Sequence, residues 1–272
     1  MNAHGSFLTP VSDSLSKMKR LFYGKYYDHP YLFPRVTNEE TYLISFPRSG
    51  NTWLRRLLTA LICKEEAVWQ LMESIVPDIH IYKPENKKKP NIKPLIVKSH
   101  TPFVDIPAKV VYVVRDGRDA LLSYYFLLLK EGKIKPDISV LDIYFDNNVW
   151  PCSWHTHVAG WLDGLEKRNP ESYKIIYYED LKKSTAEQLF LVAKFIGLPV
   201  TLSDAEQAVA LHPVRNQSKS NEISSNQENS GSVVKNSKTK WQDILVGEDL
   251  VRYEAIAGTE LQRLGYPLMS DK

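Results

Sequence analysis

Residues 47–52, with the sequence PRSGNT, bring polar side chains and a glycine together between an apolar stretch and a helical pattern. The members that could bind a ligand are Arg48, Ser49, Gly50, Asn51 and Thr52. The arginine offers a charged fork of N–H donors, and the hydroxyl and amide groups add neutral donors. A helix that begins directly after a tight turn also points free backbone N–H groups and the positive end of its dipole toward one place. The segment therefore predicts a site for an anion of phosphate size; the alternative is an ordinary strand-to-helix turn with a capped helix.

A second reactive group, the imidazole of His100, ends the apolar run PLIVKSH at residues 94–100. Imidazole titrates near neutral pH and therefore suits a general base that takes a proton from a substrate. Lys98, two positions earlier, supplies a cation near the same point. For an isolated histidine at a strand end a structural role is the first interpretation, so a catalytic role for His100 needs support from the surrounding motif.

Short apolar runs alternate with helical patterns along the chain, and these elements must position the reactive groups. The runs that predict strands lie at residues 41–46, 94–100, 109–116 and 173–180. Apolar residues recur at helical spacing from Asn51 onward, over residues 117–132, within residues 137–167 and after residue 180, and they predict helices there. This alternation predicts an α/β fold in which helices flank a central parallel sheet. Ligands of such sheets bind at the carboxyl ends of the strands, where the polar turns lie.

The composition fits a globular protein and disfavours several classes of function. The chain has 272 residues, and we expect them to form a single domain. Its 35 basic and 32 acidic residues give a net charge of +3, too small to predict nucleic acid binding. The N-terminus lacks the apolar core of a signal peptide, and no apolar run reaches membrane-spanning length. We therefore expect a cytoplasmic protein that binds neither nucleic acid nor membranes.

Metal and disulfide chemistry are not indicated by the sequence. Cys63 and Cys152 are the two cysteines, and two free thiols are favoured over one disulfide. No metal-ligand spacing is present. The turn at 47–52 also differs from a Walker A loop, G-x-x-x-x-G-K-[ST], because the first glycine and the lysine are missing. A P-loop-type nucleotide phosphotransferase is thus the less favoured alternative.

Five stretches resemble, in order, motifs of the cytosolic-type sulfotransferases, which use 3′-phosphoadenosine 5′-phosphosulfate (PAPS). SFPRSGNTW resembles their 5′-phosphosulfate loop, Y-P-K-S-G-T-T-W, and VKSHTP resembles K-T-H-L-P. YVVRDGRDALLSYY, SWHTHVAGW and YYEDL resemble the family's later motifs. The resemblance covers roughly residues 40–200. It implies a P-loop-like three-layer fold, PAPS as cofactor, 3′-phosphoadenosine 5′-phosphate (PAP) as product, and no metal.

The resemblance implies roles at the anion site and beside it. Residues 48–52 would hold the 5′-phosphate and the leaving oxygen, and Trp53 would stack on the adenine. His100 would act as the general base, while Arg48 and Lys98 would stabilise the leaving phosphate. The family usually has lysine at the position of Arg48. Arginine keeps the charge but does not give up a proton, so electrostatic assistance alone is expected from it.

Three further positions match nucleotide contacts of the family. Arg115 and Ser123 match the pair that binds the 3′-phosphate, and Tyr178 matches a residue near the adenine. A guanidinium fork with a hydroxyl suits a phosphate group. The alternatives are an ion pair of Arg115 with Asp116 or Asp119, and ordinary packing for the serine and the tyrosine.

The family's last motif, R-K-G-x-x-G-D-W, is matched only in part by VKNSKTKW at residues 234–241. Lys235 and Trp241 remain, so Lys235 is a candidate cofactor contact, but the first arginine and both glycines are replaced. The polar stretch 216–240 predicts a flexible loop that covers the cofactor. The alternatives are solvated lysines on a mobile loop and, for the whole chain, a catalytically silent PAP-binding protein.

The acceptor is expected to be a small-molecule metabolite bound by segments outside these motifs. The candidate segments are 21–33, within an N-terminal acceptor-side segment 1–35, together with 66–84 and 140–155. Their aromatic residues include Tyr26, Tyr27, Tyr31, Tyr82, Tyr144 and Phe145. The sequence does not distinguish a hydroxyl from an amine nitrogen as the nucleophile, and it predicts no oligomeric state.

Overall fold

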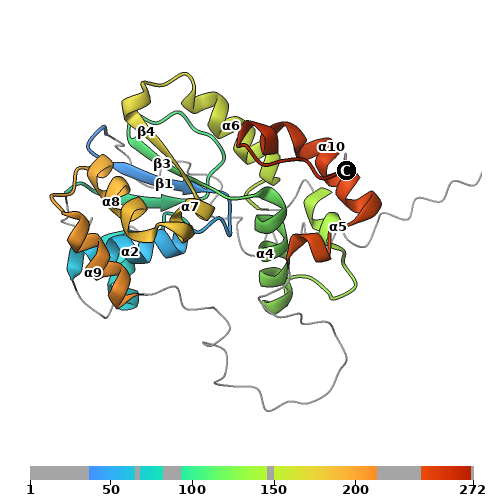
Figure 1. Ribbon diagram of the computed structural model, residues 1–272, viewed down its shortest axis with the longest axis horizontal. Coiled ribbons are helices and arrows are strands. Elements are labelled where there is room, and N and C mark those ends of the chain that lie inside the picture. Colours follow the sequence, from blue (N-terminus) through green and yellow to red (C-terminus); the bar gives the residue numbers. More distant parts are fainter. Residues whose placement is uncertain (1–36, 65–67, 82–92, 146–149, 213–239, 271–272) are drawn as a thin grey trace, which may run out of the picture.

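The computed structural model describes residues 37–64, 68–81, 93–145, 150–212 and 240–270. Within them, four parallel strands form one sheet in the order β2-β1-β3-β4. The strands are β1 (Thr41–Ser45), β2 (Ile96–Ser99), β3 (Lys109–Val114) and β4 (Tyr173–Tyr177). Helices cover both faces of the sheet (Figure 1), which confirms the predicted α/β fold with a central parallel sheet.

The helices alternate with the strands along the chain. Their bounds are α2 (Asn51–Cys63), α3 (Val68–Ile75), α4 (Gly117–Lys130), α5 (Val140–Phe145), α6 (Trp154–Leu165), α7 (Tyr178–Lys183), α8 (Thr185–Ile196), α9 (Leu202–Leu211) and α10 (Gly247–Arg263). Two short 3-10 helices are η2 (Pro170–Ser172) and η3 (Trp241–Asp243). The N-terminal segment 1–35 and residues 216–239 of the polar stretch lie outside the described residues.

Both faces of the sheet are buried, and this explains the apolar strands. Ile44 and Tyr112 pack in one core with residues of α4, α6 and α10. Leu43 and Val111 point to the opposite face and pack with residues of α2 and α8. Because helices cover both faces, a strand has few positions where a polar side chain is tolerated. The polar groups that could do chemistry are therefore concentrated at the strand ends.

The register of the sheet brings the carboxyl ends of the strands to one edge. Ser45, at the end of β1, pairs with Val113 of β3, and Ile44 pairs with Ser99 at the end of β2. Val114, at the end of β3, pairs with Tyr177 at the end of β4. The turns that follow these strands and carry the candidate residues therefore start side by side.

Strand β4 is shorter than the run 173–180 predicts. It ends at Tyr177, and Tyr178 is the first residue of α7. Tyr177 pairs with Val114, the last residue of β3, so the neighbouring strand offers no further backbone groups that could extend β4. Tyr178 consequently lies on a helical turn that faces the turn after β1.

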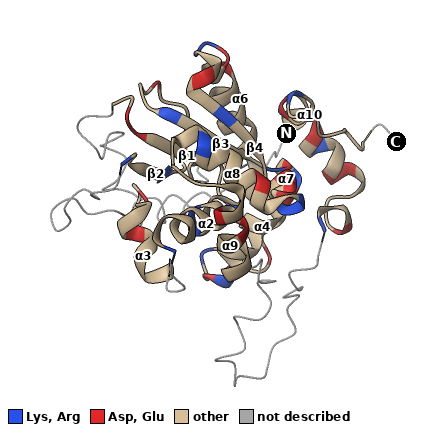
Figure 2. Ribbon diagram, turned by 60° about the vertical axis from the view of Figure 1, so that its left-hand side comes forward, with Lys and Arg blue, Asp and Glu red and all other residues tan. Residues whose placement is uncertain are grey.

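Charged residues are spread over the helices rather than gathered on one face. Figure 2 shows acidic and basic positions interspersed, and α7 carries both kinds. Cys63 and Cys152 are free thiols, as predicted. Among the described residues, no helix combines the length and the apolar character that crossing a membrane requires.

Candidate functional site

The turn after β1 has a left-handed backbone at two positions. Arg48 has a φ of 67° and Gly50 a φ of 98°. The left-handed region is uncommon for a residue with a side chain, and such strain is concentrated at functional sites. Gly50 is the N-cap of α2 and has no side chain that could cap the helix. The first N–H groups of α2 thus remain available to an anion.

Gly50→Ala should lower the free energy of unfolding by about 1–3 kcal/mol, because the new Cβ adds a clash to an unfavourable φ. That Cβ would lie 2.6 Å from Cδ2 of Tyr178. Gly197→Ala is the matched control, because Gly197 has the same φ of 98° but no atom within 4 Å of an added Cβ. Urea denaturation of both variants measures the difference. Equal costs for the two substitutions would contradict the close packing of Tyr178 on the turn.

Side chains from several elements meet at the mouth of this turn. Nε of Arg48 donates to Oγ of Ser123 on α4 at 3.0 Å, and Nη1 of Arg115 donates to the carbonyl oxygen of Arg48 at 3.0 Å. The Arg115 guanidinium lies 4.6 Å from the ring centre of Tyr178. The rings of Trp53 and Tyr178 meet edge to face, with centres 6.1 Å apart. The structure thus brings together five of the residues predicted to contact the cofactor.

Three buried donors in this cluster have no partner among the described residues. They are the hydroxyl of Ser49, the indole N–H of Trp53 and Nε of Arg115. A buried polar group without a partner costs about 1–3 kcal/mol, so such a concentration is unusual in a turn that binds nothing. An anionic nucleotide carries acceptor oxygens that could satisfy these donors, and it therefore fits the residues present.

Positive charge accumulates at the same place. Burial, and then the neighbouring Arg115, lower the pKa of Arg48 from its ordinary value. Two guanidinium groups that repel each other are stabilised by an anion placed between them. The nearby carboxylate of Asp119 lies 3.9 Å from Nη2 of Arg115, and burial raises the pKa of this carboxyl group. The cluster therefore favours a ligand with negative charge.

Asn51 and Thr52 differ from the other turn residues in what surrounds their side chains. The amide of Asn51 donates to the carbonyl of Leu43 at 3.0 Å and to the hydroxyl of Ser45 at 3.1 Å, so it ties the start of α2 to β1. Thr52 is exposed on the first turn of the helix. Their predicted contacts with a phosphate stay predictions, and for Asn51 the backbone N–H is the group left to make one.

His100 lies directly after β2, beside the end of β1. Its Nδ1 is 2.7 Å from the carbonyl oxygen of Ser45. Because a carbonyl only accepts, Nδ1 carries the hydrogen, and Nε2 of the neutral ring has a free lone pair. Burial, and then the charge of Lys98, lower the pKa of His100 well below its ordinary value. The ring is therefore neutral at neutral pH and able to accept a proton at Nε2.

Lys98 is held by Asp78, a carboxylate that lies 20 positions earlier in the chain and shares no motif with it. Its Nζ lies 2.6 Å from Oδ2 of Asp78, and both side chains are largely buried. Arg55 and Glu73 also act on Lys98 electrostatically, but burial has the largest effect and lowers its pKa. The role of Lys98 toward a leaving phosphate stays a prediction.

His80 is a neighbour of His100 that no sequence motif singles out. Its Nε2 accepts the backbone N–H of His100 at 2.8 Å. The segment that carries it joins the sheet through a single parallel bridge between Asp78 and Lys98. Neither apolar alternation nor a familiar spacing marks so short an element, and hence the sequence offers no signal for it.

Stability should fall as the pH drops below about 6.5, because three buried histidines are neutral in the folded state. Burial is the main cause that lowers the pKa of His80 to about 4, that of His157 to about 3, and that of His100 well below its ordinary value. The unfolded chain takes up these protons first. Each histidine therefore adds a slope of up to about 1.4 kcal/mol per pH unit below pH 6.5. Urea denaturation at pH 7.5, 6.5 and 5.5 measures this, and constant stability would contradict it.

Lys235 lies outside the described residues, whereas Trp241 of the same motif is described. Trp241 is buried, and the guanidinium of Arg118 lies 4.2 Å from its ring centre. Arg118 also forms ion pairs with Asp116 and Glu254, at 2.8 and 2.6 Å. Asp116 thus serves as the N-cap of α4 and a partner of Arg118.

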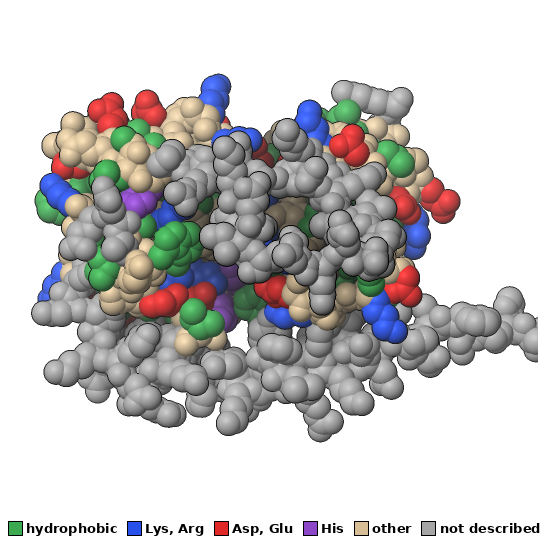
Figure 3. Space-filling view, turned by 90° about the horizontal axis from the view of Figure 1, so that it is seen from below, with side chains coloured by type: hydrophobic (Ala, Val, Ile, Leu, Met, Phe, Trp, Pro, Cys, Tyr) green, Lys and Arg blue, Asp and Glu red, His purple; other side chains and the backbone are tan. Residues whose placement is uncertain are grey.

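The acceptor side of the site is described only in part. Tyr144 is buried, its hydroxyl lies 2.6 Å from Nδ1 of His155, and its ring packs against Tyr253. The ring of Trp150 lies 5.6 Å from that of His100. Figure 3 shows His, Lys and Arg side chains together in the middle of one face of the molecule. The candidates outside the described residues are Tyr26, Tyr27, Tyr31 and Tyr82.

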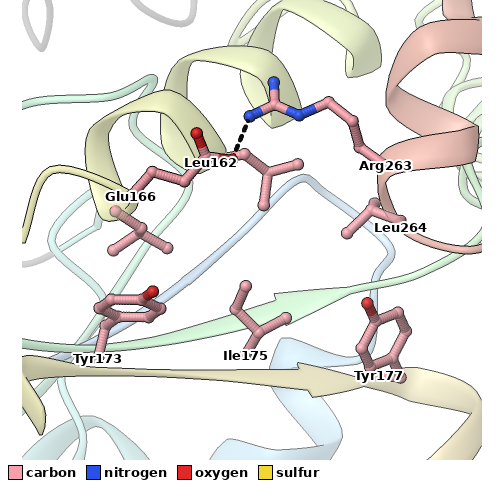
Figure 4. Close-up of a pocket in the computed structure, with 8 residues that line it drawn as sticks. Leu162, Glu166, Tyr173, Ile175, Tyr177, Arg263 and Leu264 are labelled. Carbon is pink, nitrogen blue, oxygen red and sulfur yellow. Dashed lines mark hydrogen bonds and ion pairs between the residues drawn. The ribbon is translucent and has the colours of Figure 1, made fainter. Parts of the chain in front are cut away.

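A cavity of about 230 Å³ lies elsewhere, between α6, β4 and α10 (Figure 4). Tyr173, Ile175 and Tyr177 form its floor, and Arg263 and Glu166 pair at its rim at 2.7 Å. None of the residues that line it belongs to the cluster around Arg48. The chemistry of the site is therefore not located in this cavity.

The chain is similar to known sulfotransferases in sequence. A family model described as a sulfotransferase domain matches residues 38–265. Sulfotransferase 2A6 of Mus musculus is 29% identical over 178 residues, which cover 60% of each chain. The 3-alpha-hydroxysteroid sulfotransferase of Cavia porcellus is 30% identical over 177 residues, again 60% of each. The chain thus spans about 60% of the length of the curated relatives that it matches.

Solved structures share the fold. A retinol dehydratase in complex with retinol and PAP has a TM-score of 0.60 and 16% identity, and the match covers 86% of this chain and 84% of that one. A mouse sulfotransferase complexed with PAP has a TM-score of 0.59 and 17% identity, with 84% and 86% covered. At such identities the likeness establishes the P-loop-like sulfotransferase fold and leaves the substrates of this chain open.

Proposed function

The chain belongs to the sulfotransferase family, and on this premise we propose that it transfers a sulfuryl group from PAPS to a small molecule. The observation that supports this most is the cluster in which Arg48 contacts both Ser123 and Arg115. This cluster brings positive charge and unpaired hydrogen-bond donors from two strand ends to one place. A nucleotide that carries phosphate at two positions needs such groups at both. The similar structures that contain PAP support this choice of nucleotide.

Nucleotide binding is assigned to the groups around the turn. The N–H groups at the start of α2, with Ser49, Thr52 and the charge of Arg48, hold the 5′-phosphate. Arg115 and Ser123 hold the 3′-phosphate. Since the hydroxyl of Ser123 accepts from Arg48, its own hydrogen can be donated to an anion.

The rings beside the turn are assigned to the adenine. Trp53 and Tyr178 already contact each other, so a planar base has two rings that it can pack against. Tyr178 packs so closely on Gly50 that no space remains for a side chain at that position. Lys235 remains a proposed contact of the nucleotide, on the resemblance of its motif alone.

Proton transfer is assigned to His100. PAPS, when bound, supplies a sulfuryl group attached to a phosphate that leaves as a weak base. His100 accepts the proton of the acceptor's hydroxyl or amine at Nε2, while Nδ1–H remains bonded to Ser45. Holding one nitrogen against a carbonyl fixes both the tautomer and the ring orientation. Because burial lowers the pKa of His100, its ring is already neutral and needs no prior deprotonation.

Electrostatic assistance is assigned to Arg48 and Lys98. Arg48 stabilises negative charge at the mouth of the turn without giving up a proton. Lys98 is paired with Asp78 in this structure, so an anionic ligand would compete with that carboxylate for its charge. Arg48 is therefore the main cation in this proposal.

A transfer assay tests the proposed function. The protein is incubated with PAPS, a chelator and a library of small hydroxyl and amine compounds, and products are read by mass spectrometry for the added mass of a sulfo group. We expect sulfated product and an equal amount of PAP, with the chelator present. In a parallel incubation with ATP and Mg²⁺ in place of PAPS and the chelator, turnover of ATP would instead indicate a phosphotransferase. PAP binding without transfer to any acceptor would indicate a silent nucleotide-binding protein.

A further inference from the structure

The neutral imidazole of His80 supports the backbone of His100. His100 follows Ser99, the last residue of β2, so its N–H lies beyond the sheet ladder. His80 accepts this N–H at Nε2, at 2.8 Å. Because a backbone N–H only donates, Nε2 of His80 must carry the free lone pair, and the ring hydrogen is on Nδ1.

Ring contacts reinforce this hydrogen bond. The rings of His80 and His100 are nearly parallel, at 9°, with centres 6.0 Å apart. The indole of Trp150 meets both of them edge to face, at 4.9 Å from His80 and 5.6 Å from His100. His80 therefore accepts a hydrogen bond from the backbone of His100, and both imidazole rings pack against the indole of Trp150.

Residues 77–80 run along β2 as a short parallel extension of the sheet. The N–H of Lys98 donates to the carbonyl of Pro77 at 2.8 Å, and the N–H of Ile79 donates to the carbonyl of Lys98 at 3.1 Å. Asp78 accepts from the N–H of His80 through Oδ1 at 3.0 Å and from Nζ of Lys98 through Oδ2 at 2.6 Å. These contacts set His80 level with His100.

Residues 77–80 are also connected to α2, the helix that begins at the turn after β1. The N–H of Asp78 donates to Oε2 of Glu73 on α3 at 3.2 Å. Oε1 of Glu73 pairs with Nη2 of Arg55 on α2 at 2.7 Å, and the Arg55 side chain is the more buried of the two. Contacts thus run without a break from α2, through α3, to His80 and His100.

We propose that His80 is a positioning residue that fixes the backbone of His100, so that the imidazole of His100 stays against Ser45, beside the turn after β1. The inference rests on the proposed role of His100 as general base. His80 touches His100 and not the reacting atoms, so its effect should be on the orientation of the base. Misplacing a reacting group by about 1 Å can cost about 100-fold in rate.

Burial is the main reason why His80 can accept a hydrogen bond at neutral pH. Lys98 and Asp78 face His80, and burial, followed by Lys98, lowers the pKa of His80 to about 4. The groups that face His100 are Lys98, His80 and His157. At neutral pH His80 is therefore uncharged, and the hydrogen bond to His100 persists.

Three substitutions separate the hydrogen bond from the ring contact. His80→Phe keeps a ring beside His100 and Trp150 but removes the acceptor. His80→Gln loses the ring but offers an amide oxygen that can accept the same N–H. His80→Ala removes both. His155→Gln, on α6 and outside this network, is the matched histidine control.

Amide hydrogen exchange of His100 in the protein without ligand is the first measurement, because it requires no activity. We expect exchange to be about 10-fold or more faster in His80→Phe and His80→Ala, and close to wild type in His80→Gln and His155→Gln. Unchanged exchange in His80→Phe would overturn the proposal. If His80→Phe fails to fold, His80→Gln decides. Fast exchange of the His100 N–H in a folded His80→Gln would also overturn the proposal, because the amide oxygen should have protected this N–H.

Steady-state kinetics is the second measurement. We expect kcat to fall about 10- to 100-fold in His80→Phe while the KM for PAPS stays within about 2-fold, and His80→Gln to recover most of the kcat. Equal loss in His80→Phe and His80→Gln would overturn the positioning role. If no variant and no wild type transfers sulfate, the proposed function fails, while the exchange measurement still decides whether His80 holds His100.

Discussion

His100→Ala should lower turnover by about 10²- to 10⁴-fold, because it removes the group that accepts the proton of the attacking nucleophile. His100 is 9% exposed, and its Nδ1–H is bonded to Ser45, so Nε2 is the nitrogen available for this proton. The nucleotide contacts are assigned to other strand ends. Affinity for PAP should therefore stay within about 3-fold of wild type, as measured by calorimetry.

A second variant separates lost chemistry from lost structure. In His100→Asn the amide nitrogen can take the place of Nδ1 and keep the bond to the carbonyl of Ser45, but no base remains. We expect this variant to be folded, to bind PAP, and to be as inactive as His100→Ala. Wild-type turnover in His100→Asn would show that the base is another group.

Arg115→Ala should weaken PAP binding by about 10- to 150-fold, since hydrogen bonds to charged groups contribute about 1.5–3 kcal/mol. Arg115 sits where β3 ends, over the ring of Tyr178, with its Nε unpaired. The 3′-phosphate is the group that we assign to it. The KM of the acceptor should change far less than the affinity for PAP.

Adenosine 5′-monophosphate, which lacks the 3′-phosphate, is the discriminating ligand for this variant. Arg115 also donates to the carbonyl of Arg48, so its removal could disturb the turn itself. A disturbed turn would weaken both nucleotides equally, whereas a lost 3′-phosphate contact weakens PAP alone. Arg263→Ala, which removes a surface arginine paired with Asp163 and Glu166, is the control and should leave both affinities unchanged. Equal losses for PAP and the monophosphate in Arg115→Ala would contradict the assignment.

The strands and the positions of the reactive turns were predictable, because burial on both faces leaves a strong apolar signal. The run 109–116 ends in the polar residues Arg115 and Asp116, and β3 ends directly before them, at Val114. The order of the strands in the sheet was not predictable from apolar runs, since it depends on which strands pair. That order is what brings Arg115 and Tyr178 to the turn at Arg48.

The supporting residues of the site were predictable to a smaller extent. Asp78 and His80 belong to a segment whose single bridge to β2 leaves no periodic pattern. Their contacts depend on how α3 directs the chain back along β2, which is a tertiary effect. The end of β4 was predicted too late for a related reason, because a strand ends where its neighbour does. Local sequence carries neither kind of information.

A crystal structure of the protein with PAP tests the central assignment most directly. We expect the 5′-phosphate on the N–H groups at the start of α2 and the 3′-phosphate on Arg115 and Ser123. We expect Nε2 of His100 to face the 5′-phosphate across a space that fits one sulfo group. A nucleotide bound elsewhere, or a His100 ring turned away from the mouth of the Arg48 turn, would contradict it.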